Sequence, residues 1–218
     1  RVKVRCLMVF WSQHYVKCLF FVMVLLALLI SVERCVAIEQ IAVEGQLPSH
    51  ADIHEILAQS NQSEEGIDLN ALKSLDVDAA RLIAETRGKL FLNGLTAITP
   101  EVAEVLATHR GWLHLDGLQS ISPEVATALS KHQGWLFLNG IKVLDKDVAV
   151  ALLPYRGQLY LDSVQTITDE VAEIIVKRRD GVELYGVENI NYQSVAMLRK
   201  NSEIILPEKF NRLGWWPF

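Results

Sequence analysis

Cysteine is scarce in this chain, and all of it lies near the start. The sequence of 218 residues contains three cysteines, Cys6, Cys18 and Cys35. If the segment up to Ala37 is removed, the remaining chain has no thiol, which excludes disulfides, zinc–thiolate sites and cysteine nucleophiles. Such a chain can be exported and still fold without oxidation.

Basic stretches and catalytic motifs are also missing. The formal net charge is −5, and residues 1–37 hold five basic residues and one acid, so the chain beyond them carries −9. This acidity, without a basic stripe interleaved with aromatic residues, argues against nucleic-acid binding. No phosphate-binding glycine loop, G-x-S-x-G elbow or isolated acid pair occurs. The sequence therefore predicts a protein that is not an enzyme and needs no cofactor.

Charge is absent from residues 18–32, which form an almost entirely apolar run. A helix of this length spans about 22 Å, which is less than the ~30 Å of a membrane's hydrocarbon core. Because Cys35 and Ala37 are small, residues 1–37 are predicted to be a secretory signal peptide that is cut after Ala37. An uncleaved membrane anchor at residues 18–32 and a buried core helix are the alternatives. We expect an extracytoplasmic protein, secreted or periplasmic, or else a membrane-anchored one.

The dominant feature of the rest of the chain is a repeated pattern. The stretch GWLHLDGL, which begins at Gly111, returns 23 residues later as GWLFLNGI at Gly134. Further copies begin at Gly88 and Gly157, and weaker copies flank these four. A fixed period with apolar positions in register predicts a solenoid rather than a globular core. The predicted segments are an N-terminal cap at residues 38–66, about six repeats at 67–206 and a C-terminal tail at 207–218.

Each repeat joins a strand pattern to helix start and stop signals. The first half alternates as L-x-L-x-G-L, and its period of two predicts a short strand. The second half opens with a hydroxyl residue suited to an N-cap, as at Thr99, Ser122 and Thr168. An alanine recurs at the second apolar position of each helix and would let the helix approach the sheet closely. A glycine is expected to end each helix as a left-handed C-cap, preceded in several repeats by basic residues such as Arg87, Arg110, Arg156 and Lys177. These glycines are Gly88, Gly111, Gly134, Gly157 and Gly181.

Over about two-thirds of its length the chain resembles the leucine-rich repeat family. The resemblance is carried by the paired strand leucines and the apolar residue after each turn: Leu90, Leu92 and Leu95; Leu113, Leu115 and Leu118; Leu136, Leu138 and Ile141; Leu159, Leu161 and Val164. The buried asparagine of the family is missing from its usual place, and Asn or Asp occurs earlier instead. The resemblance implies an α/β solenoid, a curved stack with parallel short strands on the concave side and helices on the convex side.

Alternation along the strands predicts three columns of outward side chains on the concave face. The central column is expected to contain Asp68, Phe91, His114, Phe137, Tyr160 and Glu183. One neighbouring column contains Lys89, Trp112, Trp135 and Gln158, and the other contains Asn70, Asn93, Asp116, Asn139 and Asp162.

We interpret this face as a ligand-binding surface, because rings anchor a partner while amides and carboxylates form hydrogen bonds to it. The candidate site residues are Phe91, Trp112, His114, Trp135, Phe137, Tyr160, Asn93, Asp116, Asn139 and Asp162. Two structural interpretations stay open, since rings on adjacent strands can stack to stabilise a sheet and Asn-Gly and Asp-Gly are ordinary turn dipeptides. The family resemblance suggests a protein or peptide partner, and the aromatic column makes a glycan the alternative ligand.

The histidines point to no catalytic or metal site. His50 and His54 lie four residues apart on an expected cap helix, but no third metal ligand is evident. His109 and His132 occupy equivalent places near helix C-termini, so we expect them to be solvated partners of the helix dipole. His114 lies near an acid of the neighbouring column, but no candidate nucleophile accompanies it.

Overall fold

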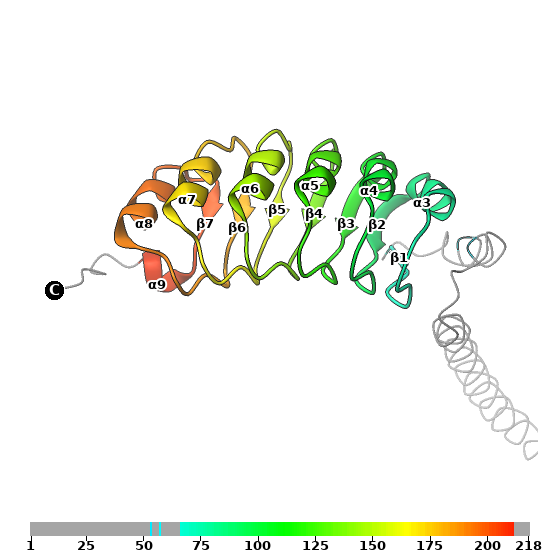
Figure 1. The fold of residues 1–218 in the computed structure, drawn as a ribbon, viewed down its shortest axis with the longest axis horizontal. Coiled ribbons are helices and arrows are strands. Elements are labelled where there is room, and N and C mark those ends of the chain that lie inside the picture. The colour runs from blue at the N-terminus through cyan, green and yellow to red at the C-terminus, as the bar shows by residue number, and fades with distance from the viewer. Residues whose placement is uncertain (1–52, 54–56, 58–65, 212–218) are drawn as a thin grey trace, which may run out of the picture. The chain divides into compact units, whose positions relative to one another are not determined.

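A computed structural model describes Ile53, Leu57 and residues 66–211, all of which belong to a unit that spans residues 45–218. The expected signal segment, most of the expected N-terminal cap and the chain after residue 211 lie outside the described residues. Within them, seven parallel strands form one open sheet in sequence order and alternate with seven helices. The protein is therefore an α/β solenoid, as the repeat pattern predicts (Figure 1).

The elements are short, and each strand is followed by one helix. The strands are β1 Ile67–Asp68, β2 Arg87–Phe91, β3 Arg110–His114, β4 Trp135–Phe137, β5 Leu159–Tyr160, β6 Val182–Glu183 and β7 Ile204–Ile205. The helices are α3 Val77–Ala84, α4 Pro100–Leu106, α5 Pro123–Leu129, α6 Lys146–Leu152, α7 Asp169–Ile175, α8 Tyr192–Leu198 and α9 Glu208–Asn211. The short helix α9 was not expected from the sequence.

Each strand pairs with the equivalent strand of the next repeat. Leu90 lies opposite Leu113, Leu113 opposite Leu136, and Leu136 opposite Leu159. The register between these strands therefore advances by the same 23 residues as the sequence pattern, and equivalent side chains form columns across the sheet.

The hydrophobic core lies between the sheet and the helices. Both strand leucines of a repeat are fully buried, as Leu113 and Leu115 show. The recurrent helix alanine is buried in every copy: Ala80, Ala103, Ala126, Ala149 and Ala172. Ile53 and Leu57, both in helical conformation, are buried in the same core. Because burial of one leucine contributes about 1.5–3 kcal/mol, the leucine columns are the main stabilising feature.

The predicted helix starts are confirmed. The side-chain oxygens of Thr99, Ser122 and Thr168 each accept a hydrogen bond of 3.3 Å from the backbone N–H three residues later. Proline at the first position of α4 and of α5 loses no helical hydrogen bond, because the first N–H groups of a helix have no partner within it.

The prediction that the repeat glycines form left-handed C-caps is wrong. Gly88 and Gly157 have positive φ, but Gly88 belongs to strand β2 and Gly157 lies four residues after Leu153, the cap residue of α6. The helices end several residues before these glycines, at cap residues in the right-handed helical region. A Cβ on Gly111 would lie 1.8 Å from the carbonyl oxygen of Gly88, and a Cβ on Gly134 would lie 1.7 Å from that of Gly111. Glycine is needed at these two positions because the preceding strand approaches so closely.

Candidate functional site

The outward face of the sheet, which we call the strand face, carries the three predicted columns. In the central column Phe91 lies opposite His114, His114 opposite Phe137, and Phe137 opposite Tyr160. These residues are half-buried, whereas the leucines that alternate with them are buried. The strand face therefore holds the candidate residues in the order that alternation predicts.

The rings of the central column stack on one another. The centroids of Phe91 and His114 are 4.4 Å apart, those of His114 and Phe137 are 3.8 Å apart, and those of Phe137 and Tyr160 are 4.1 Å apart. The His114–Phe137 and Phe137–Tyr160 pairs are nearly parallel, at 10° and 8°. Ring faces are thus covered by neighbouring rings, and the ring edges form the outer surface.

A second stack runs beside the first. Trp112 and Trp135 lie 4.4 Å apart at an interplanar angle of 10°. The ammonium group of Lys89 lies 4.8 Å from the centre of the Trp112 ring, which is a cation–π distance. Trp135 is the most exposed ring of the candidate set, with 40% of its surface accessible. The two stacks together make a continuous aromatic surface over β2 to β5.

The Asn and Asp column has a structural role that sequence reasoning missed. An oxygen of Asn93 accepts from the backbone N–H of Asp116 at 2.9 Å, and an oxygen of Asp116 accepts from that of Asn139 at 2.9 Å. The same bond joins Asn70 to Asn93 at 2.8 Å and Asn139 to Asp162 at 3.0 Å. Each side chain therefore ties its turn to the next repeat, and only its second polar atom is left for a ligand.

His114 is held between the two phenyl rings, and 13% of its side chain is exposed. Its Nδ1 lies 3.7 Å from the second carboxylate oxygen of Asp116. Its Nε2 is buried without a hydrogen-bond partner among residues 66–211. This arrangement offers a polar ring edge inside an apolar stack.

The strand face becomes acidic toward β6. The pKa of Glu183 is raised by burial and by the nearby charge of Asp162, and the amide of Gln158 donates a hydrogen bond of 3.2 Å to its carboxylate. The pKa of Asp162 is also raised, mainly by burial. Tyr185, 53% exposed, occupies the place of the next Asn or Asp, 23 residues after Asp162. Sequence reasoning left Tyr185 out because its residue type breaks the column.

The prediction that His109 and His132 are solvated is wrong. Each is 1% exposed, and its Nε2 lies 3.1 Å from the carbonyl oxygen of a glycine in the preceding repeat, Gly88 or Gly111. Since a carbonyl only accepts, each Nε2 must carry the proton. In the next repeat the hydroxyl of Tyr155 makes the equivalent bond. We call this buried column the polar ladder.

Arg178 continues the polar ladder, with guanidinium nitrogens 2.8 Å from the Leu152 carbonyl and 3.1 Å from that of Gly157. The rings of the ladder also stack, since His109 and His132 lie 6.4 Å apart at 5°. A row of donors spaced by 23 residues is visible in the sequence once the repeats are aligned, but only the fold shows that the row is buried.

Within the described part of the chain, no three His, Cys, Asp or Glu residues gather as a metal site. The histidines His50 and His54 of the expected cap lie outside that part. None of its helices has the length and apolar character to cross a membrane.

No family model matches the chain, and no curated protein matches it. The resemblance to leucine-rich repeats therefore depends on the residue pattern alone. The structure adds parallel strands in sequence order that alternate with helices.

Proposed function

We propose that the protein is a non-enzymatic binding or scaffold module of the leucine-rich-repeat type that recognises a protein or peptide on its strand face. The observation that carries this proposal is the continuous aromatic surface of two adjoining ring stacks, partly open to solvent on one face of a rigid sheet. Aromatic side chains are large, rigid anchors that lose little conformational entropy on binding, and they are enriched in protein interfaces.

The arrangement of the rings favours a peptide over a glycan. Sugars bind aromatic residues through the ring faces, but here the faces are mostly covered by the next ring of the stack. The exposed edges carry positive charge density and make T-shaped contacts with aromatic groups of a partner. The carboxylates of Asp162 and Glu183 would suit a basic residue of the same peptide, since a nearby cation favours their charged form.

Replacement of both Trp112 and Trp135 by serine tests the strand face. We expect binding to an array of peptides to weaken about thirtyfold or more, because buried tryptophan anchors often contribute 2 kcal/mol or more. Val150→Ser, a change at a residue 50% exposed on α6, serves as the control and should leave binding unchanged. A glycan array probed with the same proteins tests the alternative ligand.

Two results would contradict the proposal. If the double variant keeps its affinity but melts at a lower temperature, the ring stacks only stabilise the sheet. If ligands are captured from the glycan array alone and lost in the double variant, the strand face is a glycan site.

We also propose that the protein is exported after removal of residues 1–37, on the sequence pattern given above. Intact-mass measurement of protein recovered outside the cytoplasm is expected to give a chain that begins at Ile38. A full-length chain in the membrane fraction would instead identify residues 18–32 as a membrane anchor.

A further inference from the structure

A second charged feature lies at the edge of the sheet where the strands begin. Arg87 and Arg110 are the first residues of β2 and β3 and lie opposite each other in the strand register. Both side chains are exposed, and neither forms an ion pair with any residue of the described part. Strand pairing therefore holds two guanidinium groups near each other, and neither has an acidic partner among the described residues.

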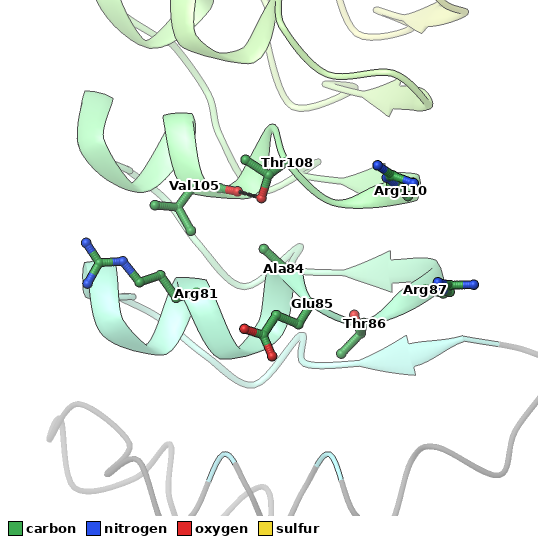
Figure 2. A pocket seen from close by; sticks show the side chains of 8 residues that line it. All are labelled: Arg81, Ala84, Glu85, Thr86, Arg87, Val105, Thr108 and Arg110. Carbon is green, nitrogen blue, oxygen red and sulfur yellow. Dashed lines mark hydrogen bonds between the residues drawn. The ribbon is translucent and has the colours of Figure 1, made fainter.

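These arginines line a groove of about 530 Å³ between the first two complete repeats. Figure 2 shows Arg87 and Arg110 at the strand side of the groove, with Arg81, Glu85 and Val105 on the helix side. Ala84 and Val105 give the groove an apolar part. The groove thus combines three guanidinium groups with a small apolar surface and one carboxylate.

The two repeats that flank the groove lack an ion pair that joins the next two repeats. Between the second and third repeats, the ammonium of Lys131 lies 2.7 Å from a carboxylate oxygen of Glu104. The equivalent residues one repeat earlier are Thr108 and Arg81, which cannot form an ion pair with each other. Arg81 instead pairs with Asp78 on its own helix at 2.8 Å, and the Thr108 hydroxyl donates to the Val105 carbonyl at 2.7 Å.

The C-termini of α3 and α4 face the same edge, and their negative dipole ends favour nearby cations. That effect explains why arginines are tolerated here, but it supplies no acidic partner for Arg87 or Arg110, and none occurs among the described residues. A carboxylate or phosphate could accept bidentate, charge-assisted hydrogen bonds from such groups and relieve the repulsion between them.

We propose that the groove between Arg87 and Arg110 binds the oxyanion of an acidic peptide segment, with Ala84 and Val105 contacting an adjacent aliphatic group. Carboxylate and phosphate share the required chemistry, so a glutamate side chain and a phosphoserine are the two sources to distinguish. This site uses none of the strand-face residues, although Arg87 and Arg110 begin the strands β2 and β3 that also carry Trp112 and His114.

The test is isothermal titration of the purified protein at low ionic strength with three probes: inorganic phosphate, a glutamate-rich peptide, and the same peptide with one phosphoserine. We expect saturable binding of at least one peptide. In the double variant Arg87→Gln/Arg110→Gln, the affinity for that peptide should fall about tenfold or more for each arginine replaced. The matched control is Arg156→Gln, because Arg156 stands at the equivalent position two repeats after Arg110 and is paired with Asp180 at 3.7 Å.

Binding should also weaken steeply between low and physiological salt, since both guanidinium groups are exposed. Preference for the phosphoserine peptide or for the glutamate peptide then identifies the source of the oxyanion. The proposal is overturned if no peptide binds saturably, or if Arg156→Gln reduces affinity as much as the double variant does. Because these variants replace none of the strand-face residues, and the Trp112/Trp135 variant replaces neither arginine, failure here is distinguishable from failure of the proposed function.

Discussion

Replacement of Gly134 by alanine is expected to lower the free energy of unfolding by about 3 kcal/mol or more. The new Cβ would lie 1.7 Å from the carbonyl oxygen of Gly111 and 2.7 Å from Nε2 of His132. The backbone leading into β4 would have to move away from β3, which weakens the strand pairing and the polar ladder together. Urea unfolding followed by circular dichroism measures the change.

Gly88→Ala is the matched control at the equivalent position of an earlier repeat. A Cβ there meets no atom within 4 Å, but the backbone has a φ of 94° that only glycine adopts readily. The expected loss is about 1–2 kcal/mol, which is the cost of left-handed backbone alone. Equal losses of unfolding free energy in Gly134→Ala and Gly88→Ala would show that the close approach of the strands is not the reason for glycine at position 134.

The second large effect is a loss of stability on acidification through His132. Burial lowers the pKa of His132 below its ordinary value of 6.5, so the unfolded chain binds the proton more readily than the folded one. The stabilisation is therefore fully present above pH 6.5 and is lost as the pH falls through the folded pKa. Denaturant unfolding at a series of pH values between 7.5 and 5 measures it.

Two substitutions separate the effect of protonating His132 from the effect of its hydrogen bond to Gly111. His132→Tyr copies the next repeat, where Tyr155 donates to the Gly134 carbonyl, and should flatten the pH dependence. His132→Phe leaves the Gly111 carbonyl without this donor and should lose about 1–3 kcal/mol even at pH 7.5. An unchanged pH profile in His132→Tyr would contradict the assignment.

Other titrating groups change the stability in a different pH range, or change it in the opposite direction as the pH falls. Hydrogen bonds at the helix starts lower the pKa values of Glu101 and Glu124, so the stability they contribute is lost only below pH 4.5. Asp162 and Glu183 have raised pKa values, so their protonation favours the folded state as the pH falls. Comparison of each variant with the original chain removes these contributions.

The sequence predicted the architecture because the repeat period, the helix-start residues and the strand alternation all indicate the same fold. The 23-residue period set the strand register, the hydroxyl residues before α4, α5 and α7 set the helix starts, and alternation placed Phe91, Trp112 and His114 on the strand face. These properties depend on local conformation and on which residues share a column, and both can be read from a repeat.

The bonds between repeats could not be predicted in the same way. Asn93 looked like a turn residue, and His109 looked like a solvated residue at the end of a helix. Their actual partners are backbone groups of the neighbouring repeat, at Asp116 and Gly88. A column shows that equivalent residues recur, but only the distance between repeats shows whether a side chain points outward or reaches across.

The sequence predicted where the candidate site residues lie better than it predicted which of their surfaces a ligand can reach. Alternation gave the columns, but the covered ring faces become evident only from the ring distances. The groove beside Arg87 and Arg110 was missed because these residues were expected in the last helical turn, where a cation has a structural explanation.

The most direct test of the strand face is hydroxyl-radical footprinting of the protein with and without a peptide taken from the array. Trp135 and Tyr192 suit the comparison, because they are 40% and 42% exposed and lie on the strand face and on α8 respectively. The proposed function predicts that the peptide protects Trp135 from oxidation and leaves Tyr192 unchanged. Protection of Tyr192 with Trp135 still reactive would place the binding surface on the helices and contradict the proposal.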